Sequence, residues 1–383
     1  MSATGTSPEL YASRAARAYG AMQRRFATRR GRYRRDGRLH LPGAAAHLWP
    51  FIRAFVATLD LAGAPAGSEG FDADAAIDER LATLERYWDT RGPWPAYASD
   101  VAGTLLGGDR YYDDNAWVGL ALVQLERMRP GAGRLDRAAD LFRFAVHGWD
   151  TRPGVPAPGG VFWVEQGRGV GRRNHDRNTV SNAPNAQLGL HLAELGDDLA
   201  PGPANAVGPR DMYEWVNGAL DAAGHAPDAG EPPGTGLFWD KIRGDASIDR
   251  ALWSYNQGNM IGLNVLLARA DGPDPGRYAS RAAAIARKAL RHYEGAYERQ
   301  PAAFHAIFFR NLLQLHAATS DATLRADITA AMRGYADQAW SAHRDDDDSF
   351  RFGGRPPSLL DQSAMVQVLA LLSWDPADYG KLA

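Results

Sequence analysis

The sequence predicts an all-α protein in which six helical hairpins close into an (α/α)6 barrel with long loops at one end. Apolar residues recur at intervals of three and four along most of the 383-residue chain, whereas strict alternation is rare. The helical segments are joined by alternately short and long connections, so they pair naturally into hairpins. A solenoid is the architectural alternative, but no fixed sequence period supports it. No shift in composition divides the chain, so we expect one domain over residues 1–383.

The apolar periodicity predicts twelve helices, at residues 13–28, 47–62, 74–88, 113–128, 135–148, 180–195, 211–222, 253–270, 278–297, 302–318, 322–342 and 359–374. Pro50 fits the first turn of the second helix. A Pro- and Gly-rich stretch at 196–210 indicates a surface loop. The long connections are 29–46, 90–112, 150–179 and 223–252. Long loops that gather at one end of a scaffold usually carry its function, so we expect the site there.

Composition excludes several classes of protein. The net charge is -2, which argues against a dedicated nucleic-acid binder. The chain has no cysteine, which excludes disulfides and thiolate metal sites. No His, Asp and Glu group has the spacing of a zinc or iron site, so we expect no metal and no cofactor. No apolar run is long enough to span a membrane. The N-terminal residues lack an apolar signal core, so we expect a cytoplasmic protein, or a secreted one if a signal was trimmed.

The segment 111–122, which reads YYDDNAWVGLAL, is the strongest candidate for chemistry. Asp113 and Asp114 stand between two tyrosines and an apolar run with helical spacing. Helix capping accounts for one aspartate but poorly for two, because neighbouring carboxylates repel. Carboxyl groups that diverge from adjacent positions can stand about 5–6 Å apart, as a retaining glycosidase requires. Capping and catalysis both remain open from the residues alone.

A second candidate stretch covers 159–182. Residues 159–164, GGVFWV, favour a short strand after a turn, and 177–182, RNTVSN, open a helix. Asn178 and Asn182 suit helix capping, but with Asn185 they are more amides than one cap requires. Amides donate and accept hydrogen bonds, which suits sugar hydroxyls, so capping and ligand binding are both plausible. Three nearby glycines only superficially resemble a phosphate loop, since the strand and helix context is missing: Gly167, Gly169 and Gly171.

A third stretch repeats the pattern of glycine, aromatics, polar loop and helix, at 236–240 and 253–258. Asp240 is either a third acid of the site or the partner of Lys241 or Arg243 in a surface ion pair. His305 is expected to pack at a helix start, not to act as a base. We expect a solvated acidic turn at 345–348 and a solvated helix end for the basic segment 24–38.

Taken together, these segments resemble glycoside hydrolase family 76, the α-1,6-mannanases. The resemblance is carried by YYDDNAW (111–117), GGVFW (159–163), RNTVSN (177–182), LFWDKI (237–242), WSYNQGNMIG (253–262) and FHAIFFRNL (304–312), with Gln362 to Ala364. The family fold is an (α/α)6 barrel. The chain departs from the family pattern at Val118, at His305 and Ala306, and around 47–55.

The resemblance implies a metal-free hydrolase that cleaves α-1,6-linked mannosides with retention of configuration. It implies Asp113 as the nucleophile and Asp114 as the general acid/base. The sugar would be bound by Tyr112, Asn115, Trp117, Trp163, Asn178, Asn182, Asp240, Tyr255, Asn256 and Gln257. The alternatives are another (α/α)6-barrel sugar enzyme, such as an uronide hydrolase or an epimerase, a non-catalytic carbohydrate-binding protein, or a nucleic-acid binder using the arginine segment. The sequence leaves open the oligomeric state and the choice between internal and end cleavage.

Overall fold

Each of the twelve predicted helices has a counterpart in the computed structural model, which describes residues 8–28, 31–34, 45–65, 71–101, 108–196, 207–224, 236–270 and 274–383. Their bounds are α1 (Pro8–Phe26), α2 (Leu48–Ala62), α3 (Ala73–Leu84), α4 (Tyr112–Met128), α5 (Leu135–His147), α6 (Thr179–Leu195), α7 (Pro209–Leu220), α8 (Ser254–Arg269), α9 (Pro275–Tyr293), α10 (Ala302–Ala318), α11 (Ala322–Ala342) and α12 (Leu359–Leu371).

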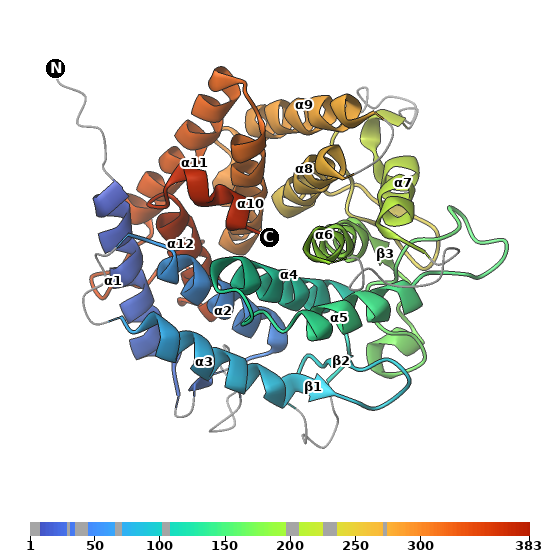
Figure 1. Cartoon of the computed structure of the whole chain (residues 1–383), viewed down its shortest axis with the longest axis horizontal. Coiled ribbons are helices and arrows are strands. Elements are labelled where there is room, and N and C mark those ends of the chain that lie inside the picture. Colours follow the sequence, from blue (N-terminus) through green and yellow to red (C-terminus); the bar gives the residue numbers. More distant parts are fainter. Residues whose placement is uncertain are drawn as a thin grey trace.

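The helices form two concentric rings, which is the predicted (α/α)6 barrel (Figure 1). In the inner ring, α2, α4, α6, α8, α10 and α12 each pack on the next, and α12 closes the ring on α2. The odd-numbered helices pack outside, for example α1 on α12 and α9 on α8. Each outer helix packs mainly on the inner helix that precedes it in the sequence, as α5 does on α4 and α9 on α8, and α1 packs on α12.

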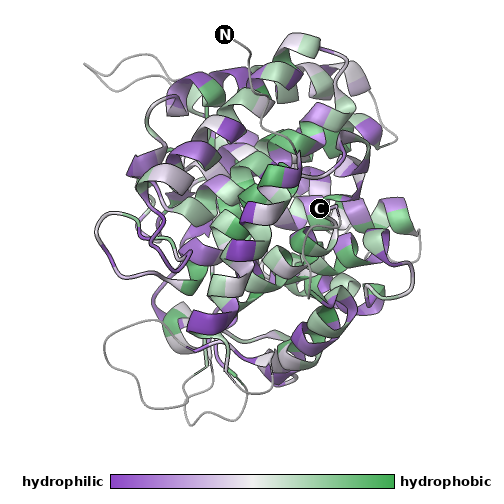
Figure 2. Ribbon diagram, turned by 90° about the vertical axis from the view of Figure 1, so that its left-hand side faces the viewer, coloured by the Kyte–Doolittle hydropathy of each residue, from purple (hydrophilic) through white to green (hydrophobic). Residues whose placement is uncertain are grey.

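The apolar pattern of each helix explains its ring. Inner helix α8 is buried along nearly its whole length, from Ser254 to Leu267, and has no polar face. Outer helix α9 buries one stripe, at Tyr278, Ala282, Ile285, Ala286, Ala289 and Tyr293, and exposes its arginines. A helix without an exposed polar stripe must be covered on every side, whereas an amphipathic helix packs on one side and exposes the other. Seen from the side, the apolar stretches accordingly gather inside the barrel (Figure 2).

The long connections gather at the end of the barrel where the inner helices begin. They also carry short strands: β1 (Trp88–Asp89) pairs with β2 (Ala96–Tyr97), and β4 (Lys241–Ile242) lies between β3 (Arg177–Asn178) and β5 (Ile248–Asp249). All these pairs are antiparallel, with Asn178 opposite Lys241. The strand predicted at 159–164 is only partly formed, because Val161, Phe162 and Val164 make isolated bridges to three different segments.

Three further expectations concern charged or polar segments. In the acidic turn 345–348, Asp347 and Asp348 form ion pairs with Arg25 and Arg17 of α1. This turn therefore holds the first helix against the chain's last third. Most of 196–210 lies outside the described residues, as do four arginines of the basic segment: Arg29, Arg30, Arg35 and Arg38. None of the helices in the described ranges is long and apolar enough to cross a membrane.

Candidate active site

A pocket of about 380 Å³ opens at the loop-bearing end of the barrel, within the size range of small-molecule sites. Residues in the first turns of α2, α4, α6, α8 and α10 contribute to its wall. The lining residues are Trp49, Tyr111, Asp113, Asp114, Trp117, Trp163, Asn178, Val180, Asp240, Lys241, Tyr255 and Phe304. A larger groove, of about 600 Å³, lies between α9 and α11 on the outer wall, away from the paired acids.

Asp113 and Asp114 occupy the first turn of α4 and both face the pocket. The Oδ1 atom of Asp113 accepts a hydrogen bond from the backbone N–H of Asp114, at 2.9 Å. Its Oδ2 atom accepts one from the indole N–H of Trp163, at 3.1 Å. The side chain of Asp114 has no hydrogen-bond partner among the described residues. The two acids therefore differ, because donors hold one carboxyl while the other is free to meet a ligand.

The environment favours the protonated form of the pair. Burial raises the pKa of Asp113 to about 7, against the hydrogen bonds from Asp114 and Trp163, which favour its charged form. Burial and the negative charge of Asp113 raise the pKa of Asp114 well above its usual range. The helix N-terminus favours negative charge at this position, although the first turn alone cannot offset the burial of two acids. The pair can thus hold one charge and one proton near neutral pH.

Aromatic rings form the pocket's walls. Tyr111 and Trp163 lie 4.8 Å apart between ring centroids, and Tyr255 and Phe304 lie 4.1 Å apart. Such rings present apolar faces on which the C–H face of a sugar can stack.

Two further lining residues, Trp49 and Trp117, have ring centroids 6.0 Å apart. The buried guanidinium of Arg53 lies 5.7 Å and 5.9 Å from their centroids, within cation–π distance. The two tryptophans are therefore held by the guanidinium of Arg53 as well as by each other.

Asp240 and Asn178 supply further polar groups to the pocket lining. Asp240 is 7% exposed and accepts a hydrogen bond from Asn256 at 3.2 Å, and burial raises its pKa. Burial also raises the pKa of Tyr255 well above its usual range, so its phenol stays a neutral hydroxyl. The Oδ1 atom of Asn178 is buried and has no hydrogen-bond partner among the described residues. A buried acceptor without a donor is costly, and a ligand hydroxyl at this wall would satisfy it.

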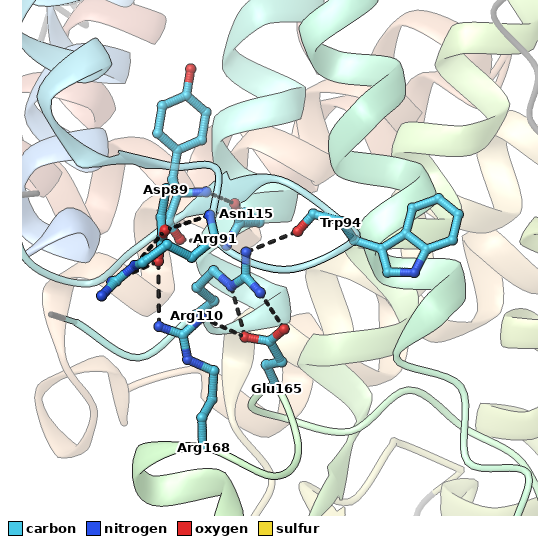
Figure 3. Close-up of polar contacts among 8 residues, drawn as sticks. Asp89, Arg91, Trp94, Arg110, Asn115, Glu165 and Arg168 are labelled. Carbon is cyan, nitrogen blue, oxygen red and sulfur yellow. Dashed lines mark hydrogen bonds and ion pairs between the residues drawn. The ribbon is translucent and has the colours of Figure 1, made fainter.

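A buried ion pair clamps the two segments that carry Tyr111 and Trp163. Arg110 donates to both carboxylate oxygens of Glu165, its Nε at 2.7 Å, and to the carbonyl of Trp94 at 2.8 Å (Figure 3). The backbone N–H of Glu165 bonds the carbonyl of Arg110 at 2.9 Å. These contacts fix the indole that holds Asp113.

Arg168 extends the same network. Its guanidinium reaches Glu165 at 3.3 Å and Asp89 at 3.4 Å, as Figure 3 shows. The β1–β2 hairpin, the start of α4 and the loop after Trp163 are therefore tied together around the acid pair.

Seven of the twelve predicted site residues line the pocket: Asp113, Asp114, Trp117, Trp163, Asn178, Asp240 and Tyr255. The other five are not pocket residues, and the structure gives their side chains internal roles. Tyr112 stacks on Phe144, with ring centroids 4.4 Å apart, and leaves room only for glycine at position 148. Asn115 bonds the backbone N–H and C=O of Tyr97 at 2.8 and 3.0 Å.

The three remaining amides brace loops in the same way. Asn182 accepts from the backbone N–H of Val161 at 2.8 Å, and Gln257 brackets the backbone of Phe238 with two bonds of 2.8 Å. Asn256 donates a hydrogen bond to Asp240 and so supports a residue of the pocket lining. These five side chains therefore brace the mouth of the barrel, and their predicted contacts with a sugar stay predictions.

The expected packing role of His305 is confirmed. It is fully buried, with its ring nitrogens 3.0 Å from the Ser254 hydroxyl and 2.7 Å from the Tyr297 carbonyl. Burial lowers its pKa to about 4, so it stays neutral. In the described part of the chain, no three His, Asp or Glu side chains are placed to hold a metal ion.

Five pocket residues were not predicted: Trp49, Tyr111, Val180, Lys241 and Phe304. Four of them lie within the motifs quoted above, and two of these, Tyr111 and Lys241, adjoin predicted residues, so adjacency was an available signal for those two. Trp49 lies in the segment that departs from the family pattern, and only its place in the first turn of an inner helix would have indicated it.

The barrel and its acid-bearing pocket are typical of glycoside hydrolases, and a family match places the protein in this class. The chain belongs to glycosyl hydrolase family 76, whose model matches residues 95–356. Among solved structures it is similar to a family 76 mannosidase from Bacteroides thetaiotaomicron, with 22% identity, a TM-score of 0.73, and coverage of 95% of this chain and 98% of that one.

Two other solved structures are also similar. One is an inactive variant of an α-1,6-mannanase from Salegentibacter sp. HEL1_6 with two successive aspartates changed to asparagine, in complex with α-1,6-mannotriose; it has 18% identity, a TM-score of 0.67, and coverage of 95% and 99%. The other is Dfg5 from Chaetomium thermophilum in complex with glucosamine, with 16% identity, a TM-score of 0.59, and coverage of 84% and 78%. No curated protein matches the chain.

Proposed function

We propose that the protein hydrolyses α-1,6-linked mannosides with retention of configuration, using Asp113 as nucleophile and Asp114 as general acid/base. The observation that carries the proposal is the adjacent acid pair in the pocket, with one carboxyl held by donors and the other free. The inactive mannanase variant altered at two successive aspartates supports these roles, as does the mannosidase of similar fold.

In the first step, a carboxylate oxygen of Asp113 bonds to the anomeric carbon while the bond from that carbon to the leaving oxygen breaks. Asp114 gives its proton to that oxygen, and the released sugar leaves as an alcohol. In the second step, Asp114 takes a proton from water, and the water oxygen displaces Asp113 from the anomeric carbon. Two inversions give net retention, and both aspartates return to their starting protonation.

The division of roles follows from the hydrogen bonds. Two N–H donors stabilise the charged form of Asp113, as a nucleophile requires. Asp114 has no donor, and the adjacent negative charge keeps its proton bound, as an acid requires. Once Asp113 is esterified its charge disappears, so Asp114 becomes more acidic and can act as the base.

The sugar would be held between the aromatic walls and the polar side opposite the acids. Asn178 and Asp240 offer acceptors for hydroxyl groups, and Tyr255 offers a hydroxyl that stays protonated. Lys241 at the rim is paired with Asp176 at 3.0 Å, which leaves the pocket dominated by acids. Such a pocket suits a neutral sugar ring that develops positive charge in the transition state.

The direct test is to follow the hydrolysis of α-1,6-mannobiose by proton NMR. The proposal predicts that α-mannose is released first and β-mannose accumulates only by mutarotation. Release of β-mannose first would mean inversion and would refute the assigned roles. The product ladder from a longer α-1,6-mannan in the same assay distinguishes trimming from an end, which gives one small product early, from internal cleavage.

An epimerase or other enzyme that uses a histidine acid/base is not favoured. His305 faces the Ser254 and Tyr297 side of the barrel wall, and the described pocket lining contains no histidine.

A further inference from the structure

A second hollow adjoins the catalytic pocket at the mouth of the barrel. This groove, of about 1000 Å³, lies between the 169–176 loop and the turn at 243–245. The ion pair of Asp176 with Lys241 separates the two hollows, since Asp176 lines the groove and Lys241 lines the pocket. Asn178, on the pocket side, is two residues further along an extended chain, or roughly 7 Å. The groove therefore begins within reach of a sugar chain bound in the pocket.

The 169–176 loop is closely packed. A Cβ atom at Gly169 would lie 1.6 Å from the Oδ1 of Asp109, and one at Gly171 would lie 1.9 Å from the carbonyl oxygen of Glu165. That same Asp109 oxygen accepts a hydrogen bond from the N–H of Val170 at 3.1 Å. The glycines that superficially resembled a phosphate loop are thus required by this close approach of backbone and side chain.

The loop presents Arg172 and Arg173 at the groove. Both side chains are exposed, and neither forms an ion pair with the described residues. The neighbouring arginines differ: Arg168 pairs with Glu165 and Asp89, and Arg243 with Asp249 at 2.7 Å. The acids that line the groove are Asp176, which is paired with Lys241, and Asp245, which accepts two hydrogen bonds from Ser247. Two guanidinium groups on a well-packed loop are thus left to bind an anion.

We propose that this groove binds an oxyanion, a phosphate ester or a carboxylate, carried by the mannoside whose glycosidic bond lies in the catalytic pocket. Guanidinium groups bind both anions through paired N–H donors, and the charge strengthens each hydrogen bond. Asn174 and His175, which also line the groove, add neutral polar groups beside the arginines. The inference rests on the proposed function and deepens it, because it makes an anionic glycan the preferred substrate class.

The test compares three α-1,6-mannotriosides that differ only at the terminal sugar, which is neutral, 6-phosphorylated or oxidised to the uronate. For the wild-type protein, kcat/KM for the phosphorylated trisaccharide should exceed that for the neutral one by about tenfold at low salt. The preference should shrink in 0.5 M NaCl because exposed charges are screened. The comparison with the uronate shows which oxyanion is preferred. A preference for either charged trisaccharide over the neutral one supports anion binding in the groove.

The double variant Arg172→Gln/Arg173→Gln should lose this preference and keep kcat/KM for the neutral trisaccharide within about twofold. A matched control is Arg277→Gln/Arg291→Gln on outer helix α9, which removes the same charge from exposed positions. The control should keep the preference. Loss of preference in both double variants would show a long-range effect of net charge and would overturn the proposed anion site.

Equal kcat/KM for charged and neutral trisaccharides in the wild type would also overturn the inference, as would an unchanged preference in the groove variant. If no trisaccharide is hydrolysed, the proposed function fails instead. Calorimetric binding of the same sugars then decides the inference, which requires tighter binding of an anionic trisaccharide that depends on Arg172 and Arg173.

Discussion

Two kinds of carboxylate surround the mouth of this barrel. The tetrapeptide Trp-Asp-Thr-Arg occurs at 88–91 and again at 149–152, each time where an outer hairpin helix gives way to a long loop. In both copies the aspartate accepts hydrogen bonds from the backbone N–H, the Nε and an Nη of the arginine two residues on, all between 2.8 and 3.0 Å. These acids hold turns.

Asp113 and Asp114 are the contrasting pair. Burial opposes ionisation of Asp89, but Arg91 outweighs it and lowers the pKa of Asp89 to about 2. Burial acts in the same direction on Asp113, no guanidinium compensates for it, and the pKa rises to about 7. The comparison teaches that burial alone does not make an acid reactive at this mouth, because a guanidinium partner can reverse the pKa shift that burial causes.

The largest expected effect is the loss of hydrolysis on removing either reactive acid. Asp113→Asn and Asp114→Asn should each lower kcat for α-1,6-mannobiose by about 10³-fold or more, because one lacks a nucleophile and the other a proton donor. Circular dichroism should show unchanged helix content. Retention of substantial activity by either variant would remove that residue from the mechanism.

Asp89→Asn should lower stability while keeping activity, which is the opposite of the result expected for the two reactive acids. The variant loses charged hydrogen bonds from Arg91, so we expect a loss of about 1–2 kcal/mol in unfolding free energy at pH 7, with kcat per folded molecule nearly kept. The folded-state pKa lies below the unfolded one, so this stability is present above about pH 4 and disappears toward pH 2. Denaturant unfolding across that pH range measures how the stability difference between wild type and variant changes with pH. Asp150→Asn, at the equivalent position of the second tetrapeptide, serves as the matched comparison.

Trp163→Phe sharpens the comparison by removing one donor from Asp113 while keeping an aromatic ring. The charged carboxylate loses stabilisation, so the pKa of Asp113 should rise further. The acid limb of the kcat/KM profile, expected near pH 7 in the wild type, should move to higher pH by about half a unit to one unit. A limb that stays in place would show that Asp113 does not govern it.

A small gain in stability is expected from Asp114→Asn. A carboxyl with a raised folded-state pKa costs stability as pH rises above its unfolded pKa, and the amide has no such cost. The side chain makes no hydrogen bond that the change would break, so we expect about 1 kcal/mol of added stability at pH 8 that vanishes near pH 4. The same gain at both pH values would point to a cause other than ionisation.

The fold was predictable because it depends on local periodicity. Helices without an exposed polar stripe, such as α8, form the inner ring, and amphipathic ones such as α9 form the outer ring. The three-stranded sheet was not predicted, since Asn178 and Lys241 are far apart in the sequence and each strand has only two residues. Pairing over such a distance leaves no local pattern.

The site was predictable by segment but not by side-chain direction. In the first two turns of α8, Tyr255 faces the pocket while Asn256 and Gln257 turn to Asp240 and Phe238. Composition cannot separate such neighbours, because amides serve sugars and loop backbones equally well. The groove arginines were not predicted for another reason. Arg168 has an acidic partner in the folded chain, whereas Arg172 has none among the described residues, and sequence alone does not reveal this difference.

The most direct measurement of the central claim is the site of covalent attachment. The protein would be incubated with an activated 2-deoxy-2-fluoro-α-mannoside, which slows the second step, then digested and analysed by mass spectrometry. The account predicts a fluoromannosyl ester on Asp113 and none on Asp114. Attachment to Asp114, or to Asp240 across the pocket, would contradict the assignment of the nucleophile.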